Sequence, residues 1–126
     1  MSVYEVSADA AFSATHSVRR PDGSMEAPHQ HDWRVTAAFR SGALDADGFV
    51  MDFLSLREAL AKVTASLRQS DLNAALGAAE GGASAERLAE SIARRLAEEL
   101  GREPHCVRVV EAPGCIAAFF PAGGSP

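Results

Sequence analysis

Apolar and polar residues alternate along two long segments in the first third of the chain. From about residue 3 to residue 18, one register is apolar and ends in His16. From His29 to Arg40, the register that begins with His29 and His31 is apolar as well. Side chains of a strand point alternately to its two faces, so both segments predict β-strands. The intervening residues 19–28 contain turn-forming Pro, Asp and Gly, which predicts an antiparallel pair.

The middle of the chain has the periodicity of two amphipathic helices. Asp52 is a suitable N-cap and precedes an apolar stripe at helical spacing, formed by Phe53, Leu56, Leu60, Val63 and Leu67. Ser84 opens a second helix, which Gly101 should end and whose stripe consists of Leu88, Ile92, Leu96 and Leu100. The glycine- and alanine-rich residues 77–82 should link the two helices.

The last third of the chain predicts a β-hairpin, from Cys106 to Glu111 and from Cys115 to Phe120. The predicted fold class is therefore α+β, in the order β-β-α-α-β-β, with a four-stranded antiparallel sheet and two helices on one face. We expect residues 1–121 to form one domain and 122–126 a disordered tail. So short a sheet has two open edges, which favours edge pairing between subunits in a homo-oligomer.

Composition narrows the possible partners. The chain has 126 residues, a formal charge of −5 and a pI near 5.3, and its arginines are scattered, which argues against nucleic acid. It contains no apolar run of the roughly 20 residues that a membrane span needs and no signal peptide, so we expect a cytoplasmic protein without a membrane partner. Cys106 and Cys115 should lie at opposite ends of the hairpin, too far apart for a disulfide, and free thiols suit a reducing compartment.

Three of the four histidines lie on the apolar faces of the first two predicted strands. His29 and His31 point the same way because they are two residues apart, and His16 ends the matching strand. Three imidazoles that leave one position open are typical of a catalytic zinc, although iron, nickel and copper also accept such ligands. The alternative is that these histidines are hydrogen-bonded residues of the core.

Six short motifs follow one another along nearly the whole chain: Phe12-Ser13-Ala14-Thr15-His16, His29-Gln30-His31, Gly48-Phe49-Val50-Met51-Asp52-Phe53, Ser70-Asp71-Leu72-Asn73, Ala83-Ser84-Ala85-Glu86 and Val110-Glu111-Ala112. In this order they resemble the motifs of the 6-pyruvoyltetrahydropterin synthase and 6-carboxytetrahydropterin synthase family, zinc enzymes with the tunnelling fold. The resemblance implies that His16, His29 and His31 bind zinc and that Glu111 binds the 2-amino-pyrimidinone edge of a pterin. A carboxylate suits this edge because it accepts two N–H bonds at once. The resemblance also implies subunits joined into a barrel, with a hexamer as one candidate.

The resemblance fails at the usual catalytic residues. Family members that make 6-carboxytetrahydropterin have a cysteine four residues before the first histidine of His-X-His, where this chain has Met25. Where an Asp-His pair is usual, it has Arg68 and Gln69, which cannot exchange protons near neutral pH. Glu26 lies three residues before His29. This pattern resembles that of a variant group of enzymes in which a glutamate replaces the cysteine. Those enzymes cleave the side chain of dihydroneopterin to give 6-hydroxymethyldihydropterin.

Two other residues are candidates for acid–base chemistry. Asp71 lies close to the missing Asp-His pair, although an aspartate at a turn or helix end is the more usual interpretation. Cys115 lies opposite Glu111 in the predicted hairpin and could face the pterin. A cysteine of this kind is more often a small buried residue of the core.

We therefore expect a zinc-dependent pterin lyase that acts on dihydroneopterin or its triphosphate, with Glu26 as base and Asp71 as a second catalytic candidate. Side-chain cleavage and conversion to a 6-carboxy or 6-pyruvoyl product both stay open. The alternatives are a non-catalytic zinc- and pterin-binding paralogue and a zinc-free scaffold. Folate, queuosine-type and biopterin routes all use relatives of this scaffold, so the pathway stays open as well.

Overall fold

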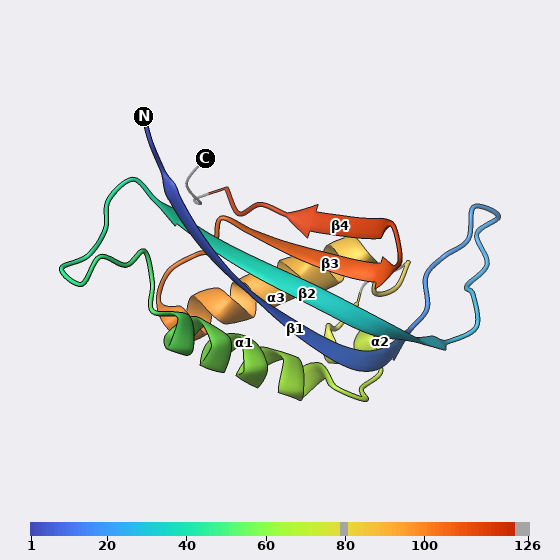
Figure 1. Ribbon diagram of the computed structural model, residues 1–126. Helices are drawn as coiled ribbons and strands as arrows, with labels where there is room; N and C mark the ends of the chain where they lie inside the picture. Colours follow the sequence, from blue (N-terminus) through green and yellow to red (C-terminus); the bar gives the residue numbers. More distant parts are fainter. Residues whose placement is uncertain (79–80, 123–126) are drawn as a thin grey trace.

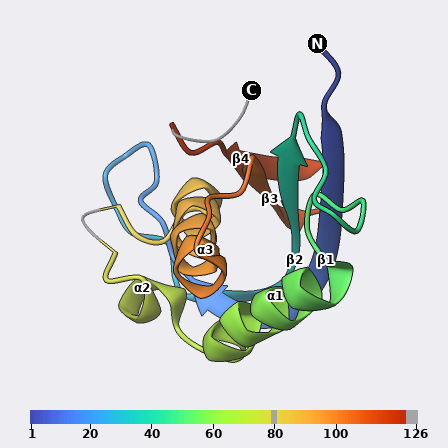
Figure 2. The same cartoon turned by 90° about the vertical axis from the view of Figure 1, so that its left-hand side faces the viewer.

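The computed structural model describes residues 1–78 and 81–122, in which four strands form one antiparallel sheet in the order β1-β2-β3-β4. The strands are β1 (Tyr4–His16), β2 (His29–Ser41), β3 (Cys106–Ala112) and β4 (Cys115–Phe119). The helices are α1 (Phe53–Leu67), α2 (Leu72–Ala75) and α3 (Ala85–Leu100). Helices α1 and α3 lie on the same face of the sheet (Figure 1, Figure 2). The α+β class and the β-β-α-α-β-β order are confirmed, with the short helix α2 as an addition.

The β1–β2 hairpin determines where the histidines lie. Its ladder runs without a break from Tyr4 opposite Ser41 to His16 opposite His29. Ala14 lies opposite His31 in the same register, so all three histidines reach the same end and the same face of the hairpin. That face also carries buried residues of the core, among them Phe12, Ala14, Trp33, Val35 and Phe39.

The helices cover this face largely as their sequence patterns predict. The carboxylate of Asp52 accepts a hydrogen bond from the Leu54 N–H at the start of α1, and the Ser84 hydroxyl accepts one from Arg87 at the start of α3. The buried residues of the two stripes are Leu56, Leu60, Val63, Leu67, Leu88, Ile92 and Leu96. Phe53 is an exception. Its side chain is 56% exposed, because it stands in the first turn of α1, so the buried stripe begins at Leu56.

The connection between α1 and α3 returns along β1. The Gln69 N–H donates to the Ser13 carbonyl at 2.6 Å, and the Thr15 N–H donates to the Ser70 carbonyl at 3.0 Å. This pairing brings α2 beside the histidine end of β1. Residues 79–80 of the predicted linker and residues 123–126 of the predicted tail lie outside the described residues.

The two cysteines are free thiols in different surroundings. Cys106 is buried, whereas Cys115 is exposed, so the core interpretation of Cys115 was wrong. The reason is its place directly after the tight turn that joins β3 to β4, at an open edge of the sheet. None of the helices in the described part of the chain is both long and apolar enough to cross a membrane.

Candidate functional site

Three imidazole rings meet at the loop end of the β1–β2 hairpin. The ring centroid of His16 lies 4.7 Å from that of His29 and 5.0 Å from that of His31, and the last two are 4.7 Å apart. One ligand atom of each histidine lies within 4.8 Å of those of the other two. The rings are roughly perpendicular to one another, with interplanar angles of 69°, 70° and 84°. The fourth histidine, His105, packs edge-on against Phe120 instead.

Backbone carbonyls set the orientation of two of these rings. Nδ1 of His16 lies 2.8 Å from the carbonyl oxygen of Ala83, and Nδ1 of His29 lies 3.0 Å from that of Ala27. A carbonyl oxygen only accepts, so both Nδ1 atoms carry the proton and donate it. The lone pair of each neutral ring is then on Nε2. Metal-binding histidines in proteins are usually held in this way.

Nε2 of His16 and Nε2 of His31 are buried and have no hydrogen-bond partner among the described residues. His16 is only 1% exposed. A buried polar atom without a partner costs about 1–3 kcal/mol, and a metal ion at the common centre would relieve this cost for both rings. The histidines therefore fit a metal ion.

The lowered pKa of His31 also favours metal binding. Burial lowers the pKa of its imidazole below the ordinary 6.5, and a positive charge on His16 or His29 would lower it further. The carboxylates of Glu111 and Glu26 act in the opposite direction and raise the pKa. The net lowering keeps the ring neutral at physiological pH, which is the form that binds a metal.

Glu111 brings a carboxylate to this cluster from the third strand. Its Oε1 lies 3.5 Å from Nε2 of His16, and its Oε2 lies 4.0 Å from Nε2 of His31. The β3–β4 ladder is irregular between Val110 and Ala112, so Glu111 stands at the bulge. Val109 pairs with Val35 on the buried face of the sheet, and Glu111, two residues further along β3, has the same phase, so it points to the face that carries the histidines.

Glu26 brings a second carboxylate from the loop between β1 and β2. Its backbone N–H donates to the Val18 carbonyl at 3.0 Å, and its Oε1 accepts from the Val18 N–H at 3.0 Å. The same Oε1 lies 3.7 Å from Nε2 of His29. The side chain is partly exposed, so the carboxylate is both held by the backbone and open to a ligand.

Asp71 does not join this cluster. Its carboxylate accepts a hydrogen bond from the Asn73 N–H and forms the N-cap of α2, which is the interpretation that the sequence favoured. Met25, at the position of the usual cysteine, is an exposed apolar side chain.

A pocket of about 340 Å³ opens beside Glu111. Its walls come from β3, β4, the start of α3 and the loop after β1, and are formed by Val18, Ser84, Ala85, Glu86, Glu111, Cys115, Ile116 and Ala117. Glu111 thus belongs to both the pocket and the histidine cluster. The sequence placed Ser84 and Glu86 in a motif without assigning them to a site, and it carried no signal for Val18 or Ile116.

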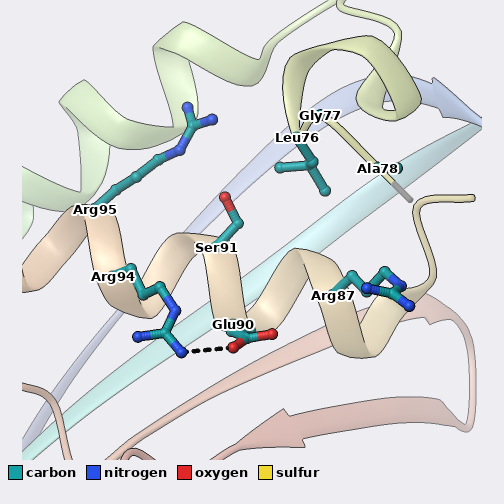
Figure 3. A pocket seen from close by; sticks show the side chains of 8 residues that line it. All are labelled: Leu76, Gly77, Ala78, Arg87, Glu90, Ser91, Arg94 and Arg95. Carbon is teal, nitrogen blue, oxygen red and sulfur yellow. Dashed lines mark hydrogen bonds and ion pairs between the residues drawn. The ribbon is translucent and has the colours of Figure 1, made fainter.

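A larger pocket of about 430 Å³ lies between α3 and the turn after α2 (Figure 3). Three arginines face it, but Arg94 pairs with Glu90 at 2.7 Å, and Arg95 donates to the Ser66 hydroxyl and the Ala75 carbonyl. Its walls do not include Glu111, which joins the smaller pocket to the histidine cluster, so the smaller pocket is the better candidate for chemistry.

Comparison with known proteins agrees with this arrangement. The sequence profile of the 6-pyruvoyl tetrahydropterin synthase family matches residues 5–122. The chain belongs to this family. Members of the 6-pyruvoyl tetrahydropterin synthase family are lyases that bind pterins. A search of curated proteins finds no significant match.

Solved structures of the family are similar in fold. The Caenorhabditis elegans 6-pyruvoyl tetrahydropterin synthase has a TM-score of 0.80 at 16% identity, over 97% of this chain and 98% of its own. The Plasmodium falciparum enzyme has a TM-score of 0.77 at 21% identity, over 96% and 99%. A Plasmodium vivax enzyme with glutamate replaced by alanine, described as a catalytic residue mutant, has a TM-score of 0.76 at 18% identity, over 96% and 99%. The predicted tunnelling fold is confirmed.

Proposed function

We propose that this protein is a zinc-dependent pterin lyase that acts on dihydroneopterin or its triphosphate and cleaves the pterin side chain with Glu26 as base. The observation that carries the proposal is the convergence of three imidazoles, two of which have buried and unpartnered Nε2 atoms, beside two carboxylates. His16, His29 and His31 would hold the zinc ion. Bound there, zinc would polarise an oxygen of the substrate and ease the loss of a proton from it.

Glu111 would bind the pterin ring. It lines the pocket and its Oε1 lies 3.5 Å from Nε2 of His16, so a pterin on this carboxylate would have its side chain close to the histidines. The carboxylate can accept two N–H bonds from the 2-amino-pyrimidinone edge in a fixed geometry. The pocket volume of about 340 Å³ falls in the range that small-molecule sites commonly have.

Glu26 would take the proton that starts the cleavage. The base removes the proton of a side-chain hydroxyl, and the adjacent carbon–carbon bond breaks to release an aldehyde. The electron pair passes to the carbon attached to the ring, which takes up a proton and becomes the hydroxymethyl group. The Val18 N–H holds Oε1 of Glu26 in place for this role. The catalytic glutamate described for the Plasmodium vivax enzyme supports a glutamate as catalyst in this family.

Oligomer formation belongs to the same proposal. Strands β1 and β4 are the open edges of the sheet, and Ile116 on β4 is 62% exposed beside the pocket. Pairing of these edges between copies would cover both edges and the exposed apolar surface. We propose a homo-oligomer on this ground, and a hexamer is one arrangement that light scattering would identify.

A non-catalytic protein that binds zinc and a pterin is the second candidate. The loss of the usual acid–base residues favours it, because Arg68 and Gln69 cannot replace the Asp-His pair, whereas the three histidines and Glu111 are retained.

Glu26→Gln separates the two candidates. A lyase that uses Glu26 should lose about 100-fold or more of its turnover of dihydroneopterin or of the triphosphate in this variant, with unchanged zinc content and pterin affinity. Glu103→Gln, an exposed glutamate in the loop before β3, is the control and should keep full turnover. Wild-type protein that binds zinc and pterin but forms no product from either substrate would support the second candidate.

A further inference from the structure

We infer that Asn73 is a positioning residue of the metal centre, which holds His16 in its ligand orientation through the backbone on both sides of the ring. The inference rests on the proposed metal site. It extends that proposal to a residue that contacts neither the metal nor the substrate, and it assigns a purpose to the short helix α2.

One side chain here satisfies four hydrogen-bonding groups. Oδ1 of Asn73 accepts from the backbone N–H of Ser17 at 3.1 Å and from that of Ala83 at 3.3 Å. Its Nδ2 donates to the Ser17 carbonyl at 3.1 Å and to the Ser17 hydroxyl at 3.2 Å. A carboxamide has two donor hydrogens and two acceptor lone pairs, so this pattern uses its full capacity.

The two residues that Asn73 binds are those that orient His16. Ser17 follows His16 in the chain, so fixing both its N–H and its carbonyl fixes the backbone of the ligand. The carbonyl of Ala83 accepts the Nδ1 proton of His16 at 2.8 Å and thereby directs Nε2 to the cluster. Asn73 therefore connects the backbone beside His16 to Ala83, whose carbonyl sets the tautomer of His16. In sequence, Asn73 is 56 residues from Ser17 and 10 residues from Ala83.

Gly82 and Asp71 complete this arrangement. A Cβ on Gly82 would lie 2.0 Å from the Ser17 carbonyl oxygen and 3.0 Å from Nδ2 of Asn73, so the segments approach this closely only because residue 82 is glycine. The carboxylate of Asp71 accepts a bond from the Asn73 N–H at 3.0 Å and caps α2. Asp71 thus holds Asn73, a role that differs from the catalytic one considered for it from the sequence.

Residues that orient metal ligands typically change metal affinity about 10- to 100-fold when they are replaced. We expect Asn73→Ala to weaken zinc binding by such a factor, measured by competition with a chromophoric chelator. Asn73→Asp keeps the shape and one acceptor oxygen but turns the donor into a second acceptor that faces the Ser17 carbonyl, so it should also weaken zinc binding. It also keeps the test open if Asn73→Ala does not fold.

Thr64→Val is the control for a general loss of stability. The buried Thr64 hydroxyl donates within α1, to the carbonyls of Leu60 and Ala61, so this variant also removes a buried hydrogen bond. It should lower the free energy of unfolding without weakening zinc binding more than about twofold. Asn73→Ala with an affinity no weaker than that of Thr64→Val would overturn the inference.

Nitrogen-15 NMR of the metal-free protein provides a readout that does not depend on zinc. In the wild type, His16 should be in the Nδ1–H tautomer, and in Asn73→Ala both tautomers should be populated. An unchanged tautomer in Asn73→Ala contradicts the inference, whatever zinc does. If wild-type protein binds no zinc while the tautomer still depends on Asn73, the proposed function fails and the positioning role stands.

Discussion

Replacement of Gly82 by alanine tests the close packing beside His16. Gly82 has a φ of +87°, which costs a residue with a side chain about 1–2 kcal/mol. The new methyl group would also lie 2.0 Å from the Ser17 carbonyl oxygen, a backbone atom that cannot move without Ser17. Overpacking of this kind costs about 1–3 kcal/mol, because the neighbouring backbone must shift.

Gly23→Ala provides the matched control. Gly23 has nearly the same backbone conformation, with a φ of +90°, but a Cβ there meets no described atom within 4 Å. The free energy of unfolding of this variant should fall only by the cost of the backbone conformation, about 1–2 kcal/mol. The free energy of unfolding of Gly82→Ala should fall by about 1–3 kcal/mol more than that of Gly23→Ala. This difference is the cost of the steric contact with Ser17 and Asn73.

Urea unfolding of the metal-free protein is a suitable assay. The single tryptophan, Trp33, is fully buried, and its ring centroid lies 5.0 Å from that of His16, so its fluorescence reports on this region. A shift of the Ser17 carbonyl would also disturb the backbone of His16, so Gly82→Ala should weaken zinc binding and Gly23→Ala should not. Equal free energies of unfolding and equal zinc affinities in the two variants would refute this reasoning.

Three further predictions concern the site. Either His29→Ala or His31→Ala should abolish stoichiometric zinc binding, measured as metal per chain, and a full complement in either variant would reject the ligand assignment. Glu111→Gln should weaken pterin binding by about 1.5–3 kcal/mol, the range for a hydrogen bond to a charged group, and an unchanged calorimetric affinity would exclude the anchor role. Because burial lowers the pKa of His31 in the folded state, the unfolded chain binds its proton more readily, so the metal-free protein should lose stability as pH falls through 6.5. Urea midpoints that stay constant or rise over this interval would contradict the last prediction.

The parts of the fold that rest on periodicity could be predicted from the sequence. Strict alternation predicted β1 and β2 to within two residues at either end, and the N-caps Asp52 and Ser84 predicted the starts of α1 and α3. The phase of the alternation also predicted that the histidines share one face. These features depend on local backbone geometry, which a single sequence encodes directly.

Other features depend on contacts between distant segments. The short helix α2 has too few residues for a periodic pattern, and the four hydrogen bonds of Asn73 join separate segments of the chain, at Ser17 and at Ala83. The position of Glu111 beside the histidines follows from the pairing of β3 with β2, and that of Glu26 from its pairing with Val18. Motifs identified these two glutamates as candidates, but their distances from the histidines required the tertiary structure.

The most direct test of the central proposal is to incubate the zinc-loaded and the zinc-stripped protein with dihydroneopterin and, separately, with its triphosphate, and to resolve the products by mass. We predict a 6-hydroxymethyl product together with the released aldehyde, formed by the zinc-loaded protein and not by the stripped one. A 6-carboxy or 6-pyruvoyl product would contradict side-chain cleavage, and equal product without zinc would contradict the role of the metal. Tight pterin binding without any product would contradict catalysis itself.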